Sequence, residues 1–303
     1  MNIIIKNILL ACTLLSIIVP CFGQTTSDKI IFLTDYYETF VDEVNANDKK
    51  TESIYLEMVH NPIYNKYFQK SEYASIVKEI LASPMNNIFE LKQSIDRIAL
   101  NKATIENKII DALNKSQQYI DNDSLTIYVI PANPNLRQVI EGMNGIMGLT
   151  AGSKQIILTI EPNISGWENM LQYAVAHEFN HAYWTNLNFG KSTKWTLLDY
   201  LVFEGRGDYF AHLIYPNVIA PWTRALTENQ ISDLWNKIKP NLQSEDLGYQ
   251  MKIMFGSSND PLWGGYSLGY DIVRTALAKN KNLKVDNWTN LEAVNILEQS
   301  KYK

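Results

Sequence analysis

The segment His177-Glu178-Phe179-Asn180-His181 carries an HExxH pattern inside a helix-compatible run from Trp167 to Asn186. Residues four positions apart lie on one face of an α-helix, so both imidazoles can reach one metal ion. Glu178 follows the first histidine, where its carboxylate can reach a water on that ion. These are the parts of a catalytic zinc site. The alternative is a pair of surface histidines, but the chain has only four histidines, which makes a chance match rare.

A third protein ligand is expected further along the chain, because catalytic zinc sites combine three protein ligands with one water. The continuation HExxHxxGxxH is excluded, since its later positions hold Trp184 and Leu187. The next apolar-periodic run, residues 195–215, contains Glu204-Gly205-Arg206-Gly207-Asp208, and residues 188–190 supply a turn before it. A glutamate on an apolar helix face is costly to bury unless it is paired or binds metal. Glycines within a helix are costly unless something approaches its backbone closely. Both features favour Glu204 as a ligand.

Other polar residues near Glu204 allow more than one interpretation. Asp208 lies four residues further on the same face and could accept the free N–H of a ligating histidine, fixing its tautomer. Alternatively, Asp208 could be the third ligand itself. His212 could reach the same pocket, although an ordinary partly buried histidine is the simpler interpretation. We expect Arg206 to be solvated and His60, which has no partner motif, to have no role in the site.

The pattern His177-Glu178-x-x-His181 followed by Glu204-x-x-x-Asp208 resembles the gluzincins, thermolysin-like metallopeptidases with a glutamate as third zinc ligand. Glu204-Gly205 and the later segment 265–270 (GYSLGY) are similar to a bacterial family of predicted zinc-dependent proteases catalogued as a domain of unknown function. This likeness covers roughly residues 120–300. Thermolysin has an asparagine before its glutamate, where this chain has Phe203, so the assignment of Glu204 depends on the narrower resemblance.

The resemblance also implies how the site works. One Zn²⁺ per chain would be bound by the two motif histidines and Glu204, with Glu178 as the general base. Gluzincins commonly stabilise the oxyanion with a tyrosine or histidine, which suggests Tyr266 or Tyr270. We favour Tyr266, although the four-residue spacing of these tyrosines is also that of a helix packing pair.

The N-terminus has the pattern of a secretory signal over residues 1–23. Lys6 is its only charge, and the apolar run from Ile8 to Val19 is short for a membrane span. Cleavage is expected before Gln24. The alternatives are an uncleaved anchor or a lipoprotein modified at Cys21, where the preceding proline is a poor match.

Composition narrows the class of protein further. Both cysteines of the chain lie within the signal, so the exported body has neither disulfides nor thiolate ligands. A formal net charge of −5 and the lack of a basic run argue against nucleic-acid binding. Beyond the signal there is no apolar stretch of membrane-spanning length, so we expect a soluble body without stable membrane insertion. The sequence does not predict the oligomeric state.

The expected fold is α+β and predominantly helical. Residues 24–120 are expected to form an N-terminal helical region with apolar stripes at helix spacing. Two β signals, residues 124–130 and 155–160, flank a glycine-rich stretch in which residues 151–153 predict a turn. Strands just before the HExxH helix match the zincin plan, in which an extended substrate pairs with an edge strand. Residues 121–303 would form this zincin-like metallopeptidase domain, with a small sheet before the motif helix.

The sequence therefore predicts an exported zinc peptidase that hydrolyses peptide or protein substrates. The expected site residues are His177, His181 and Glu204 for the metal, Glu178 and Tyr266 for catalysis, and Asp208 behind a histidine. Two alternatives stay open: an inactive zinc-containing binding module, and a zinc hydrolase that acts on a non-peptide amide. A structural zinc site normally needs four protein ligands and no base, which counts against the first. Endopeptidase and aminopeptidase modes are both compatible with the sequence.

Overall fold

The computed structural model describes residues 28–46, 50–122, 124–191, 194–280 and 282–303, and the predicted signal segment lies outside them. Its strands are β1 (Lys29–Phe32), β2 (Thr126–Pro131), β3 (Ile146–Gly152) and β4 (Gln155–Ile160). Its α-helices are α1 (Thr34–Ala46), α2 (Thr51–Tyr55), α3 (Asn61–Ile63), α4 (Ala74–Leu81), α5 (Ile88–Leu100), α6 (Lys102–Gln117), α7 (Arg137–Gly142), α8 (Trp167–Asn188), α9 (Leu197–Ile214), α10 (Glu228–Ile238), α11 (Leu247–Phe255), α12 (Gly264–Leu277), α13 (Val285–Thr289) and α14 (Ala293–Gln299). The fold is therefore α+β and predominantly helical, as predicted.

The strands form one mixed sheet in the order β1-β2-β4-β3. β1, β2 and β4 are parallel, whereas β3 runs antiparallel to β4 at one edge. Alternate residues of a strand face opposite sides, and here they enter two separate cores. Ile127 and Val129 join the core that contains α8 and α9, while Tyr128 and Ile130 join the core of α1–α4. Because both faces are covered, the central strands β2 and β4 are almost continuously apolar.

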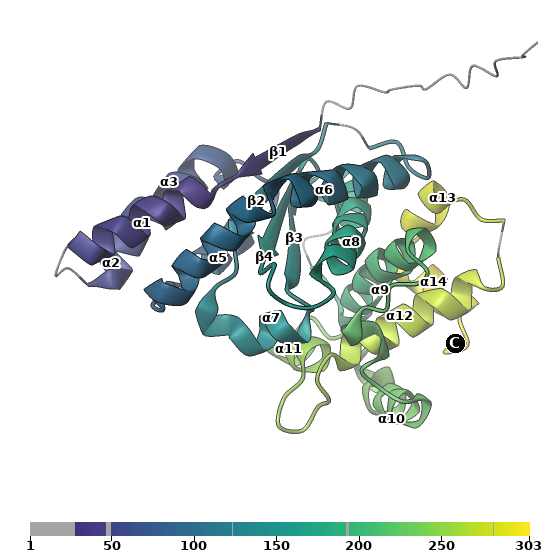
Figure 1. Cartoon of the computed structure of the whole chain (residues 1–303). Coiled ribbons are helices and arrows are strands. Elements are labelled where there is room, and N and C mark those ends of the chain that lie inside the picture. The colour runs from purple at the N-terminus through teal and green to yellow at the C-terminus, as the bar shows by residue number, and fades with distance from the viewer. Residues whose placement is uncertain (1–27, 47–49, 123, 192–193, 281) are drawn as a thin grey trace, which may run out of the picture.

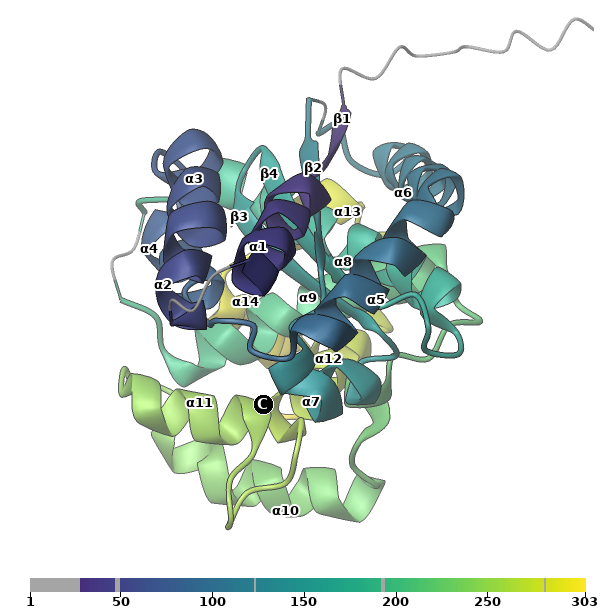
Figure 2. The same ribbon diagram turned by 60° about the vertical axis from the view of Figure 1, so that its left-hand side comes forward.

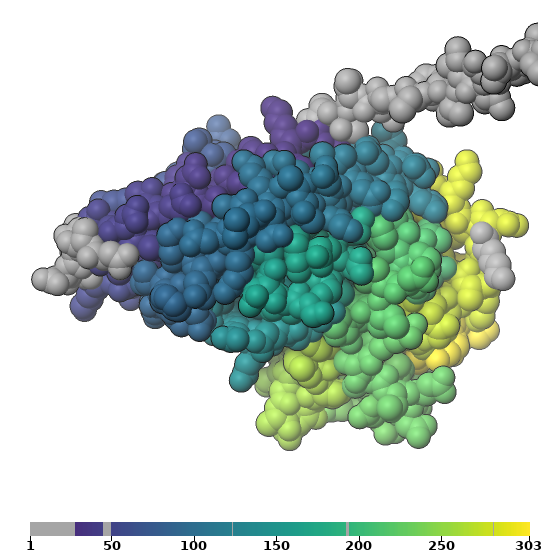
Figure 3. Space-filling view, in the orientation of Figure 1, coloured from purple at the N-terminus to yellow at the C-terminus, as the bar shows by residue number. Residues whose placement is uncertain are grey.

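The N-terminal helices cover the sheet face opposite α8. Figures 1 and 2 show α1–α4 gathered on one side of the sheet and α8, α9 and α12 on the other. In Figure 3, residues of α5 and α6 fill the surface between the purple N-terminal helices and the green C-terminal half. α6 belongs to the core of α8, although the sequence placed it in the N-terminal region. The apolar stripe expected on α4 is only half buried, since Ile76 and Ile80 are exposed.

Two strands differ from the sequence expectations. β1 lies in a region expected to be helical, and it forms by parallel pairing with β2. β3 continues through residues 151–152, which were expected to form a turn, and the hairpin turn follows at residues 153–154. A bulge between Thr150 and Gly152 accommodates the extra residue.

Helices α8 and α9 pack against each other. Residue pairs 173 with 208 and 181 with 204 lie in contact, so the two helices run antiparallel. α9 begins with a capping box between Thr196 and Asp199, in which each residue binds the other's main chain. On the far side of α9, Gly205 meets Gly269 of α12, and a Cβ on either glycine would overlap main-chain atoms of the other helix. The sequence predicted that something approaches the α9 backbone closely at its glycines. At Gly205 the approaching group is the backbone of α12.

Among the described residues, no helix combines the length and apolar character needed to cross a membrane.

Candidate metal centre

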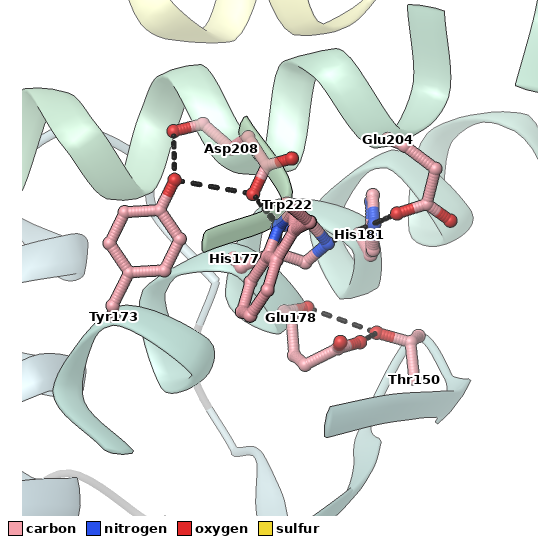
Figure 4. Close-up of polar contacts among 8 residues, drawn as sticks. All are labelled: Thr150, Tyr173, His177, Glu178, His181, Glu204, Asp208 and Trp222. Atoms are coloured by element: carbon pink, nitrogen blue, oxygen red, sulfur yellow. Dashed lines mark hydrogen bonds and ion pairs between the residues drawn. The ribbon is translucent and has the colours of Figure 1, made fainter. Parts of the chain in front are cut away.

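Two histidines of α8 and one glutamate of α9 converge at the helix interface. Nitrogen atoms of His177 and His181 and a carboxylate oxygen of Glu204 all lie within 4.8 Å of one another. Glu204 Oε2 is 3.3 Å from His177 Nε2 and 3.5 Å from His181 Nε2. Figure 4 shows the Glu204 carboxylate directed at His181, with His177 beside it. The structure thus brings together the three residues that the sequence predicted as metal ligands.

Asp208 lies behind His177, on the side away from Glu204. Its Oδ1 accepts hydrogen bonds from His177 Nδ1 at 3.0 Å, the Tyr173 hydroxyl at 3.2 Å and Trp222 Nε1 at 2.8 Å (Figure 4). A carboxylate oxygen accepts, so Nδ1 is the donor in this bond, and in the neutral imidazole Nε2 is then the nitrogen left to bind a cation. Asp208 therefore lies where it can orient His177, which is the role that the sequence predicted for it, with direct ligation as the alternative.

His181 is oriented differently. Its imidazole stacks on the Phe203 ring with centroids 3.8 Å apart and planes 5° from parallel. Both ring nitrogens are buried without a hydrogen-bond partner among the described residues. Unpaired buried polar atoms are costly, and a metal ion at the cluster would satisfy one of them. Two imidazoles and a carboxylate are also a common donor set for zinc. The residues present therefore fit this metal.

Glu178 lies beside the cluster and is held by β3. The Thr150 hydroxyl donates to Glu178 Oε2 at 2.7 Å and also contacts the Glu178 carbonyl oxygen at 3.1 Å. Gly148 leaves space for the same side chain, because a Cβ there would lie 2.6 Å from its carboxylate. The edge strand thus fixes the carboxylate that follows the first histidine.

Gly207 allows α9 to approach the first histidine. A Cβ at this position would lie 2.8 Å from the His177 ring. One of the two glycines of α9 therefore faces the site, as the sequence suggested, while Gly205 faces α12.

The charges of the protein groups favour a cation at this position. Burial by itself raises the pKa of Glu204, but its contacts with the two histidines lower that pKa to about 2. Burial by itself lowers the pKa of His177, but the charge of Asp208 and hydrogen bonds to Asp208 and Glu204 hold it well above its usual value. Two carboxylates thus hold positive charge between them, which is the environment that a bound metal ion requires.

Tyr266, expected near the oxyanion, lies on α12, and the charges of three carboxylates of the site act on it. Burial raises the pKa of Tyr266 well above its usual value, and the charges of Glu204, Asp208 and Glu178 add to this rise. Its ring packs against Phe255 and Trp263. The other tyrosine considered, Tyr270, packs edge-on against His212 instead.

The remaining candidates lie outside the cluster. His212 contacts Tyr270 and belongs to no group of metal-binding side chains among the described residues. His60 bonds locally to Asn61 and to the Lys78 carbonyl. The expectation of a solvated Arg206 is wrong, because this side chain is buried and donates to the Leu291 carbonyl. Burial lowers the pKa of Arg206 to about 10.

Several residues that position the centre were not found from the sequence: Gly148, Thr150, Tyr173, Phe203 as a stacking partner, and Trp222. Tyr173 lies four residues before His177 on the same helix face, so its spacing was a usable signal. Thr150 and Trp222 come from other elements and reach the site only through the tertiary fold.

Comparisons with known proteins match the part of the chain that contains this candidate metal centre. A family model described as "Predicted Zn-dependent protease (DUF2268)" matches residues 105–298, which contain every residue of the centre. The chain is also 25% identical over 185 residues to the uncharacterized protein YjaZ of Bacillus subtilis (strain 168), covering 57% of this chain and 68% of that protein. No solved structure gives a significant match.

Proposed function

This chain belongs to the family of predicted Zn-dependent proteases, and we propose that it is an exported peptidase that uses one zinc ion. His177, His181 and Glu204 would hold the ion. Bound zinc supplies a Lewis acid that makes water acidic near neutral pH and polarises a carbonyl. The observation that carries the proposal is the convergence of the three ligand atoms within 4.8 Å beside a fixed glutamate.

In this proposal Glu178 is the general base. It would take a proton from the attacking water and pass it to the leaving amine. The hydrogen bond from Thr150 keeps the carboxylate at the edge strand, where a substrate would lie. Asp208 holds His177 in the tautomer that presents Nε2 to the ion. Tyr266 is the candidate donor to the developing oxyanion, because it is partly buried and the charges of the three carboxylates act on its hydroxyl.

An extended peptide has an obvious place to bind. β3 is an edge strand, and peptides commonly add to such edges by main-chain hydrogen bonding. Thr150 of this strand contacts Glu178, so a peptide on the free edge of β3 would lie next to the general base. This supports peptides rather than other amides as substrates.

The test is cleavage of a peptide library, read by mass spectrometry, with native protein and Glu178→Gln compared at equal zinc. We expect cleavage by the native protein alone, with zinc bound equally by both. Glu204→Ala should instead weaken zinc binding itself. No cleavage by either form would favour an inactive zinc-binding module, and equal cleavage by both would refute the role of Glu178.

Export is part of the proposal and has its own test. N-terminal sequencing of the protein secreted or released from the periplasm should begin at Gln24. A mature protein that retains Met1, or that carries lipid at Cys21, would contradict this expectation.

A further inference from the structure

The two long edges of β3 differ in what their main-chain groups contact. The Gly145 carbonyl accepts a hydrogen bond from Glu161 N at 2.8 Å, which places residue 145 in a bonded position of the β3–β4 ladder. Bonded and non-bonded positions alternate in an antiparallel pair. The register is continuous from residue 146 to residue 150, so the main-chain groups of Gly148 and Thr150 point away from β4. Within the described part of the chain, they make no other main-chain hydrogen bond.

These unpaired main-chain groups belong to the part of β3 that adjoins Glu178. The Thr150 hydroxyl donates to Glu178, and Gly148 lies against the same carboxylate. A peptide paired with Gly148 and Thr150 would therefore have its scissile bond close to these two residues.

Beyond Thr150 the edge is closed by Tyr73. The bulge turns the Ala151 carbonyl outward, where it accepts a hydrogen bond from Tyr73 N at 3.1 Å. The Tyr73 hydroxyl lies 3.1 Å from Thr185 Oγ1, and its ring packs edge-on against Phe189. Thr185 is one turn after His181 on α8. Tyr73 thus spans from β3 to the metal-site helix, next to α4, which Figure 2 shows beside the sheet.

The segment that carries Tyr73 is fixed to the β3–β4 hairpin. Ser71 donates to the Gln155 side chain, and Ser153 donates to Glu72. The Glu72 carboxylate lies where a Cβ on Gly152 would be, so this glycine leaves room for it. These contacts fix the two residues that precede Tyr73 to the hairpin, so this segment closes the end of the edge.

The end of β3 that Tyr73 closes would face the part of the substrate on the amino-terminal side of the scissile bond. Antiparallel pairing is the more stable arrangement, and it directs the amino-terminal part of a peptide on β3 toward Ala151. If the residue before the scissile bond lies opposite Gly148, the third residue before the bond lies opposite Thr150, and the next meets Tyr73. We propose, on the basis of the peptidase function above, that the substrates are peptide amino termini and that the enzyme releases fragments of about three residues or fewer.

The test is a series of peptides with one cleavable sequence, preceded by from about one to about six residues on its amino-terminal side. The kcat/KM of the native protein should stay constant for peptides with up to about three residues on the amino-terminal side. It should fall by about tenfold or more for longer peptides. Cleavage that is independent of this length would overturn the inference and leave the peptidase proposal intact. Loss of all cleavage in the series and in the library would refute the peptidase proposal itself.

Two variants assign the cutoff to Tyr73. Tyr73→Ala removes the contacts with Thr185 and Phe189, so longer amino-terminal segments should be accepted. Tyr73→Phe keeps the ring and the main-chain bond to Ala151, and it should keep the native cutoff. A native cutoff in folded Tyr73→Ala would show that the Tyr73 side chain does not set the cutoff, because this variant keeps the main-chain bond to Ala151. If Tyr73→Ala does not fold, the peptide series on the native protein decides the question.

Discussion

Asp208 offers a sharp test of the centre, because three donors share one oxygen of a fully buried carboxylate. Asp208→Asn keeps the shape of the side chain but removes its charge. A hydrogen bond to a charged acceptor is worth about 1 kcal/mol more than a neutral one. Only the bond from His177 acts directly on a proposed metal ligand. We therefore expect the zinc dissociation constant to rise about tenfold, with up to about 3 kcal/mol lost from the free energy of unfolding.

The assay is a competition titration of zinc against a chromophoric chelator at fixed pH, with folding checked by circular dichroism. Tyr173→Phe is the matched control, because it removes one donor and leaves the charge of Asp208 in place. Its dissociation constant should change by less than about threefold. An unchanged dissociation constant in folded Asp208→Asn would refute the orienting role of this carboxylate.

Three further changes probe other parts of the structure. Gly148→Ala places a Cβ 2.6 Å from the Glu178 carboxylate, so kcat should fall by about a hundredfold while the zinc content measured by atomic absorption stays native. Phe203→Leu removes the ring stacked on His181, and zinc affinity should weaken by about threefold to tenfold in the chelator assay. Burial by itself raises the pKa of Asp271, but hydrogen bonds from Lys301, Tyr302 and Arg274 lower it below its usual value. The stabilising contribution of Asp271 is therefore present above about pH 4 and is lost as the pH falls through the lowered value. Asp271→Asn should cost about 1 kcal/mol in urea unfolding at pH 7, and this difference should shrink at acid pH.

The sequence predicted the helices of the site and their main residues because those signals are local. The HExxH spacing, the turn before α9 and the four-residue interval between Glu204 and Asp208 all follow from helix geometry. β2 and β4 were found because short runs rich in β-branched residues end at prolines or near them. The domain division at residue 120 stays a prediction.

The missed features depend on contacts between distant segments. β1 has only four residues, and it becomes a strand through pairing with β2, which follows nearly a hundred residues later. β3 contains two glycines that argue against a strand, but pairing with β4 overrides this local preference. Arg206 is buried because the chain near Leu291 folds back over α9, which no local pattern indicates.

The contact between Gly205 and Gly269 limits which substitutions the sequence can accept during evolution. Here α9 and α12 touch through main-chain atoms, so the distance between them does not depend on the size of core side chains. Glu204 is the residue directly before this contact. Substitutions elsewhere in the core can therefore accumulate without moving the proposed ligand, whereas any side chain at either glycine would displace it. Because main-chain contact sets the distance between α9 and α12, core side chains can be substituted without changing the position of Glu204.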